Sequence, residues 1–249
     1  MDSMNESDRV ALVTGASRRI GAEIVRGLHA AGYRVLLHYH RSEEAAQQLA
    51  GALNAERPDS VLALRADLDD TAALDELVRR AIDAWGHLDA LVNNASAFYP
   101  TPLGTVTESQ WDALLGSNLK APFFLCQAAA PQLARRQGAI VNLVDVYAER
   151  PLKGYPVYSV AKAGLAALTR SLAVELAPDV RVNGVAPGAI LWPEQTDGGQ
   201  TQADILARIP LARSGSPADI AGAVRFLLAD APYVTGQIIA VDGGRSVFI

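Results

Sequence analysis

Short apolar runs alternate with longer amphipathic stretches along most of this chain. The apolar runs are rich in Val, Ile and Leu and cover 10–13, 33–37, 61–64, 88–92, 139–144, 180–185 and 237–241. Such runs predict strands that are covered on both faces, because a half-exposed strand would alternate apolar and polar residues. The stretches between them predict helices at 20–31, 43–55, 71–85, 108–136, 158–176 and 217–229.

Regular alternation of strand and helix predicts an α/β fold with parallel strands joined by right-handed crossovers. We expect a single Rossmann-type doubly wound sheet of about seven strands with helices on both faces. No linker, repeat or low-complexity segment divides the chain, so residues 1–249 are expected to form one domain. The least regular stretch, 188–209, follows the sixth predicted strand. Such sheets bind ligands at that end, so we expect a substrate flap there, with a disordered loop as the alternative.

Composition and charge exclude several classes of function. A net charge of −5 with no basic stripe argues against nucleic-acid binding. No apolar run is long enough to span a membrane, and the polar start "MDSMNESDRV" lacks a signal core. The single cysteine, Cys126, is expected to be a buried thiol in a cytoplasmic protein. The four histidines lack ligand spacing, so we expect no metal.

The first predicted strand runs directly into "TGASRRIG", and a predicted helix follows. A strand, a Gly-rich turn and a helix in this order predict a dinucleotide site. Gly15 permits the tight turn, Gly21 permits close packing of the helix, and the helix N-terminus attracts pyrophosphate. Arg18 and Arg19 stand where the helix dipole disfavours cations, which indicates a bound anion beside them. Two solvated arginines are the alternative.

The second predicted strand ends in "HYHRS", where a dinucleotide fold reads the adenosine ribose. An acidic residue at this place would repel a 2′-phosphate, and none is present. Arg41 can hold a phosphate with two parallel hydrogen bonds, and His38, His40 and Ser42 add donors. The cluster predicts NADP(H), with a solvated loop as the alternative. Asp67, past the third strand, is a candidate acceptor for the adenine amino group or a helix N-cap.

Two further stretches carry candidate chemistry. In "YSVAK", Tyr158 and Lys162 are four residues apart and therefore share one helix face. An ammonium beside a phenol favours the phenolate, and such a pair can deliver a proton at neutral pH. The stretch "LVNNASAFY" after the fourth strand is expected to border the cofactor.

Together these stretches resemble the short-chain dehydrogenase/reductase family over nearly the whole chain. "TGASRRIG", Asp67, "NNA", Asn118, "YSVAK", "RVNGVAPG" and "VTGQIIAVDGG" occur in the family's order. The resemblance implies that Tyr158 donates a proton, that Lys162 lowers its pKa and holds the nicotinamide ribose, and that Asn118 supports a proton-relay water. The expected cofactor-binding residues are Gly15, Arg18, Arg19, Ile20, Gly21, His38, Tyr39, His40, Arg41, Ser42, Asp67, Leu68, Asn94, Ala95, Ser96, Tyr158, Lys162, Pro187 and Gly188.

Two departures from the general family pattern resemble the pteridine reductases. Asp145 stands where most members have a serine on the fifth strand, and Arg19 stands where most have glycine. With "LHYHRS" and "NNASAFYPTPL", the resemblance implies NADPH-dependent reduction of a pterin or folate. Asp145 with Tyr158 would protonate the ring nitrogen beside the carbon that takes the hydride. Phe98 would stack on the pterin, and Ser96 and Arg19 would bind its polar edge and the cofactor phosphates.

Several alternatives stay open at this level. Asp145 could be a capping acid and Phe98 a core residue, and Tyr99, Leu191 and Trp192 are further candidates for lining the pocket. A carbonyl reductase such as a 3-oxoacyl-carrier-protein reductase would share the fold, but the missing serine counts against it. A non-catalytic NADP(H)-binding regulator would not need the tyrosine, lysine and asparagine set, so the presence of the complete set counts against this class. The family resemblance also implies a homotetramer formed through the apolar helices at 121–133 and 163–176.

Overall fold

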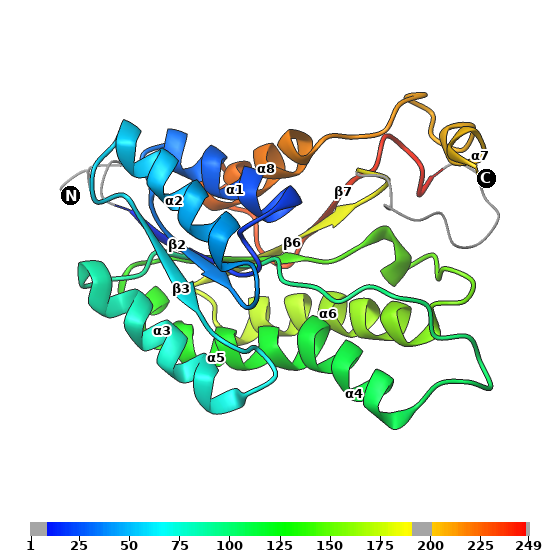
Figure 1. Cartoon of the computed structure of the whole chain (residues 1–249), viewed down its shortest axis with the longest axis horizontal. Coiled ribbons are helices and arrows are strands. Elements are labelled where there is room, and N and C mark those ends of the chain that lie inside the picture. Colours follow the sequence, from blue (N-terminus) through cyan, green and yellow to red (C-terminus); the bar gives the residue numbers. More distant parts are fainter. Residues whose placement is uncertain (1–8, 191–200, 248–249) are drawn as a thin grey trace.

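The computed structural model describes residues 9–190 and 201–247. Seven parallel strands form one sheet in the order β3-β2-β1-β4-β5-β6-β7, which confirms the predicted fold class (Figure 1). The strands are β1 Val10–Val13, β2 Arg34–Tyr39, β3 Val61–Arg65, β4 Ala90–Asn93, β5 Ala139–Leu143, β6 Arg181–Pro187 and β7 Ile238–Val241.

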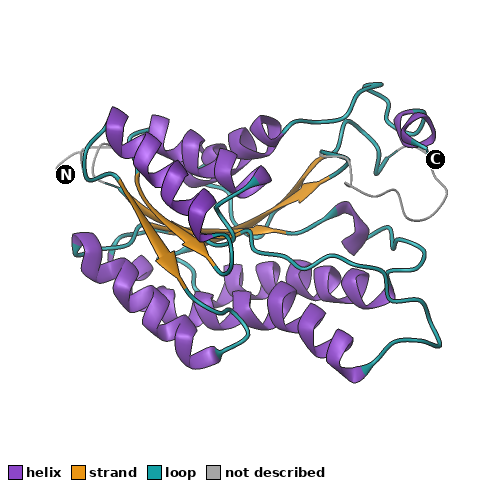
Figure 2. Cartoon of the chain, in the orientation of Figure 1, coloured by secondary structure: helices purple, strands orange, loops and turns teal. Residues whose placement is uncertain are grey.

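Helices cover both faces of this sheet, as Figure 2 shows. One layer consists of α1 (Arg19–Ala30), α2 (Glu43–Glu56) and α8 (Pro217–Arg225). The other layer consists of α3 (Thr71–Trp85), α4 (Glu108–Leu115), α5 (Ala121–Arg135) and α6 (Pro156–Glu175). The central strands β1, β4 and β5 are therefore buried at every position, which is why they are almost continuously apolar, whereas the edge strands β3 and β7 are partly exposed.

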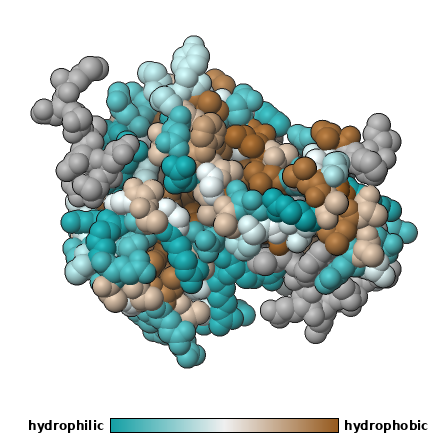
Figure 3. Space-filling view, turned by 90° about the horizontal axis from the view of Figure 1, so that it is seen from above, coloured by the Kyte–Doolittle hydropathy of each residue, from teal (hydrophilic) through white to brown (hydrophobic). Residues whose placement is uncertain are grey.

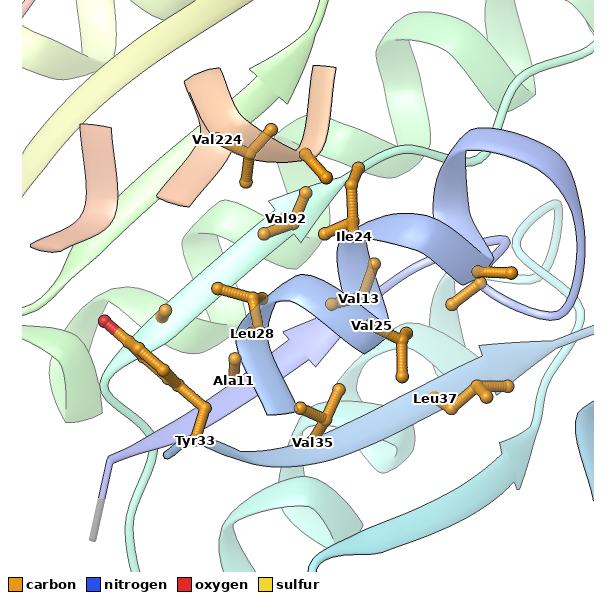
Figure 4. Close-up of a cluster of buried hydrophobic side chains, with 14 of the residues drawn as sticks. Ala11, Val13, Ile24, Val25, Leu28, Tyr33, Val35, Leu37, Val92 and Val224 are labelled. Carbon is orange, nitrogen blue, oxygen red and sulfur yellow. The ribbon is translucent and has the colours of Figure 1, made fainter. Parts of the chain in front are cut away.

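The core beneath α1 illustrates how the sequence pattern becomes packing. Ile24, Val25 and Leu28 recur at helical spacing, and all are at most 1% exposed. Figure 4 shows these side chains pointing from α1 onto Val13 and Val35 of the sheet. A second buried cluster fills the space between the sheet and the α3/α5 layer.

The predicted helix at 108–136 is divided by one π-helical turn. Residues Gly116–Lys120 form this turn between α4 and α5, and Asn118 within it is fully buried. Its side-chain amide donates to the carbonyls of Leu114 (3.0 Å) and Ala97 (2.9 Å). A π-turn holds one extra residue that apolar periodicity does not reveal. A second π-turn, Phe226–Asp230, similarly follows α8.

The expected flap at 188–209 lies only partly within the described residues. Leu191 and Trp192 fall outside them, whereas Gln202–Leu206 form the short helix α7. Thr201 begins this helix with a capping box to Asp204.

Cys126 is 0% exposed, which confirms the buried thiol, and burial raises its pKa to about 12. In the described ranges, no helix combines the length and apolarity that crossing a bilayer requires. Over the same ranges, no three His, Cys, Asp or Glu side chains group as metal ligands would.

Candidate active site

The strand order reverses between β1 and β4, and in sheets of this kind a crevice lies outside the carboxyl ends of the strands at such a switch point. A cavity of about 510 Å³ lies there, within the size range of small-molecule sites. The residues that line it are Gly15, Ser17, Arg18, Arg19, Ile20, Gly21, His38, His40, Ser42, Asp67, Leu68, Asp69, Asn94, Ala95, Ser96, Ala97, Ala113 and Ser117.

The glycine turn after β1 is packed so tightly that side chains are excluded from it. Gly15 has φ +59°, and a Cβ there would lie 2.8 Å from Cα of Ala95. A Cβ at Gly21 would meet the carbonyl oxygen of Gly15 and lie 2.6 Å from Nδ2 of Asn94. Thr14 completes the turn, because its hydroxyl accepts the N–H groups of Asn94 and Ala95, both at 3.0 Å. Because of these close contacts, the N-terminus of α1 faces the cavity. The glycine turn and this helix end together fit a pyrophosphate.

His38 differs from the expected phosphate donor. Its side chain is 1% exposed, Nδ1 accepts the N–H of Gly15 at 3.1 Å, and Nε2 lies 3.2 Å from the carbonyl of Ala66. Because Gly15 must donate, we assign the proton to Nε2, and burial lowers the pKa of His38 to about 4. Both ring nitrogens therefore hold the glycine turn to the ends of β2 and β3.

Tyr39 also departs from the expectation. Successive side chains of a strand point to opposite faces, and Tyr39 points into the core beneath α1 and α2, where it is 5% exposed. Its hydroxyphenyl group is therefore not at the cavity.

The remaining residues of "HYHRS" do not all reach the cavity. His40 and Ser42 line it, whereas Arg41 is exposed and does not line it. Asp67 lines it as well and lies 3.6 Å from Nε2 of His40. The N-cap of α3 is Asp70, whose carboxylate accepts the N–H of Ala72. This excludes the helix-cap alternative for Asp67.

Arg18 and Arg19 both line the cavity at the start of α1. Arg19 has φ +53°, in the left-handed region that favours glycine. A side chain held there costs about 1–2 kcal/mol, and residues in such backbone conformations concentrate at functional sites. The arginine that replaces the family's glycine therefore occupies a strained position on the cavity wall.

Asp145 and Tyr158 form a hydrogen-bonded pair and are not among the residues that line the cavity. The Tyr158 hydroxyl donates to Oδ2 of Asp145 at 2.7 Å, and Oδ1 accepts the N–H of Tyr147 at 2.9 Å. Asp145 thus caps the short helix at Val146–Ala148 with one oxygen and faces Tyr158 with the other. Burial raises the pKa of Asp145, and burial together with the Asp145 charge raises the pKa of Tyr158. Tyr158 therefore keeps its proton and can donate it.

Lys162 lies one turn after Tyr158 in α6, on the same helix face as predicted. Its Nζ donates to the carbonyl of Leu143 at 2.8 Å and lies 5.8 Å from the centroid of the Tyr158 ring. Burial lowers the pKa of Lys162 to about 8. The expected lowering of the tyrosine pKa is not found, because burial and the Asp145 charge raise the pKa of Tyr158.

Asn118 connects the π-turn to the loop after β4. Its Oδ1 accepts the Ser96 hydroxyl at 2.7 Å, while its amide holds the carbonyl of Ala97. The buried asparagine therefore fixes the loop that carries Ser96 into the cavity. The extra residue of the π-turn places this side chain inside the fold.

Two further aromatic rings, those of Phe98 and Tyr155, pack beside Tyr158. Phe98 is 47% exposed, which excludes the core alternative. Its ring stacks on Tyr155, with centroids 4.6 Å apart, and meets the Tyr158 ring edge-on at 4.8 Å. Tyr99 packs behind, with its hydroxyl on the carbonyl of Gln110. Tyr155 was not predicted from the sequence. Its position three residues before Tyr158 was the feature that could have indicated it.

Pro187 and Gly188 lie at the end of β6 and, like Tyr158 and Lys162, are not among the residues that line the cavity. A Cβ at Gly188 would lie 2.7 Å from Cα of Asp242, so this glycine permits close packing beside the end of β7. Thr14 and Ser17 are site residues that the sequence analysis did not single out, although both lie within "TGASRRIG".

Comparison with known proteins agrees with this geometry. A family model described as enoyl-(acyl carrier protein) reductase matches residues 15–246. Pteridine reductase 1 of Leishmania tarentolae is 42% identical, with 96% of each chain aligned. A 3-oxoacyl-(acyl-carrier-protein) reductase of Staphylococcus aureus is 41% identical over 94% of this chain and 96% of its own. The corresponding Synechocystis enzyme is 38% identical over 96% and 98%. The chain therefore belongs to the short-chain dehydrogenase/reductase family, whose members are oxidoreductases.

Proposed function

We propose that this protein is an NADPH-dependent pteridine reductase, with residues 1–249 forming one catalytic domain. The observation that carries the proposal is the 2.7 Å hydrogen bond between Tyr158 and the Asp145 carboxylate. A ketone reductase needs a neutral donor aimed at one oxygen, whereas a pterin needs its ring nitrogen protonated. The similarity to a pteridine reductase along 96% of the chain supports the same substrate class.

The residues of the cavity fit NADPH. The turn at Gly15 and Gly21, with the N-terminus of α1, would hold the pyrophosphate. Arg18, His40 and Ser42 would surround the 2′-phosphate, and Arg41 would reach it from the rim. When bound, NADPH supplies the hydride.

The chain's own residues supply the proton and the orientation of the substrate. Tyr158 gives its phenolic proton to the ring nitrogen, so that a C=N bond becomes CH–NH once hydride has reached the carbon. Lys162 stabilises the phenolate that remains, and Asp145 orients the hydroxyl before transfer. Phe98 offers the exposed aromatic face on which a flat heterocycle stacks, and Ser96 and Arg19 would bind its polar edge.

A carbonyl reductase is the second candidate, favoured by the 41% identity to a 3-oxoacyl-(acyl-carrier-protein) reductase. Purified protein should be incubated with NADPH and dihydrobiopterin, dihydrofolate or an acetoacetyl thioester, and NADPH oxidation followed by absorbance. We expect oxidation with the pterins. Turnover of the thioester alone would replace our proposal with the second candidate. Tight NADPH binding without turnover of any substrate would indicate a regulator.

The matched variant for this assay is Tyr158→Phe, which keeps the ring and removes the hydroxyl. We expect its kcat to fall by about 10²–10⁴-fold, the usual contribution of a general acid. The NADPH dissociation constant, measured by fluorescence titration, should stay within about twofold. A fully active variant would remove Tyr158 from the mechanism.

We also propose a cytoplasmic homotetramer. Phe123 on α5 is 40% exposed, and Val160 and Val174 on α6 are 52% and 81% exposed. Apolar residues also gather on the opposite, α1/α8 face, where Figure 3 shows them in brown among hydrophilic side chains. Faces of this kind are typical of subunit contacts. Light scattering of the eluting protein should give the mass of four chains, and a monomer mass would contradict this.

A further inference from the structure

The C-terminal segment after β7 turns back towards Asp145. Gly243 and Gly244 have φ values of +66° and +88°, which a reversal of this kind requires. The Asp242 carboxylate accepts the N–H groups of Gly244 (2.9 Å) and Ser246 (2.6 Å) and so fixes the turn. Arg245 lies between these two anchored residues, so its position is determined by the backbone.

The Arg245 side chain rests on the residue that holds Asp145. Its guanidinium carbon lies 5.6 Å from the centroid of the Tyr147 ring, within the range of a cation–π contact. The backbone N–H of Tyr147 is the donor to Oδ1 of Asp145. Arg245 is partly buried, and none of the ion pairs between residues 9–190 and 201–247 involves it.

Four groups from three elements interact with the Asp145 carboxyl, two by hydrogen bonds and two through their charges. Tyr158 and Lys162 come from α6, Tyr147 from the turn after β5, and Arg245 from the turn after β7. The cations of Lys162 and Arg245 both lower the pKa of Asp145, against burial, which raises it. Lys162 has a pKa of about 8 and loses its charge in mildly alkaline solution, whereas an arginine stays charged throughout. Arg245 is therefore the permanent cation beside this carboxyl.

We propose that Arg245 is a positioning residue for the Asp145–Tyr158 pair, seated on Tyr147 and keeping Asp145 an anionic hydrogen-bond acceptor. The inference rests on the proposed function only in that the pair takes part in the reaction. It holds for either a pterin or a carbonyl substrate.

The test compares Arg245→Gln and Arg245→Lys with the wild type. The pH dependence of kcat should be measured with NADPH and whichever of dihydrobiopterin or acetoacetyl thioester the wild type reduces. Removing the Arg245 cation favours protonation of Asp145. The limb of the kcat–pH profile that reports titration of the Asp145–Tyr158 pair should therefore move to higher pH in Arg245→Gln. Arg245→Lys should return it towards the wild-type position. Arg225→Gln, which removes an exposed arginine from α8, should leave the limb in place.

A second measurement does not depend on turnover. The Asp145 carboxyl can be titrated by ¹³C NMR in the NADPH-bound protein, with its signal assigned from Asp145→Asn. We expect the Asp145 midpoint to lie at higher pH in Arg245→Gln than in the wild type. An unchanged or lower midpoint, or a uniform loss of kcat with the same profile, would overturn the proposal. Absence of pterin turnover by the wild type would overturn the proposed function but not the role proposed for Arg245.

Discussion

Lowering the pH should destabilise this protein through one buried histidine. His38 is 1% exposed and holds the N–H of Gly15 on an unprotonated nitrogen, so the fold accommodates only the neutral ring. Burial lowers its pKa from the ordinary 6.5 to about 4. In the unfolded chain the same side chain takes up a proton as the pH falls below about 6.5.

The size of the effect follows from the difference between the two pKa values. Above pH 6.5 His38 is neutral in both states and stability does not depend on it. Between 6.5 and about 4 only the unfolded chain binds the proton, so the free energy of unfolding falls as the pH falls. A difference of roughly 2.5 units at 1.36 kcal/mol each gives a loss of about 3 kcal/mol. That is a large part of the 5–15 kcal/mol typical of a folded protein.

The assay is urea unfolding followed by tryptophan fluorescence at several pH values between 4 and 7.5, at one protein concentration. His38→Asn is the matched variant, because its side-chain oxygen can still accept from Gly15 but does not titrate. Other titrating groups, including His29, are present in both proteins and cancel in the difference. The wild type should lose stability more steeply than His38→Asn below pH 6.5. Parallel curves for the two proteins would refute the role assigned to His38.

Three further predictions follow from packing. Gly21→Ala places a Cβ 2.6 Å from Nδ2 of Asn94, so NADPH affinity should fall more than tenfold by fluorescence titration, whereas Gly51→Ala, which meets nothing within 4 Å, should bind normally. Arg19→Gly relieves about 1–2 kcal/mol of strain against an entropy cost of about 0.5–1 kcal/mol, so urea unfolding should show a more stable protein that binds NADPH less tightly. Cys126 is 0% exposed with a pKa of about 12, so it should react with a disulfide reagent only in denaturant; labelling of the native protein would contradict the structure.

The strand and helix positions and the glycine turn could be predicted because they depend on local sequence. Apolar runs mark strands that are buried on both sides, and "TGASRRIG" requires glycine wherever its side chains would collide. The π-turn at Asn118 was not predictable, since one extra residue leaves the apolar pattern nearly unchanged.

The site was predicted less completely than the fold. Tyr158 and Lys162 could be paired from their spacing alone, because one helix carries both. The roles within "HYHRS" could not be divided, since that depends on which side chains reach the cavity and which the core encloses. In the structure His38, His40 and Ser42 line the cavity, but both ring nitrogens of His38 are engaged by the backbone, and Tyr39 lies in the core.

The sequence by itself determined the α/β architecture, the position of the nucleotide turn and the residue types available for chemistry. Those features follow from chain periodicity and from conformations that only certain residues adopt. Only the tertiary structure decided which distant groups share one environment. Asp145, Tyr158 and Arg245 come from three segments, and their protonation depends on burial and on charges that meet only after the sheet has formed.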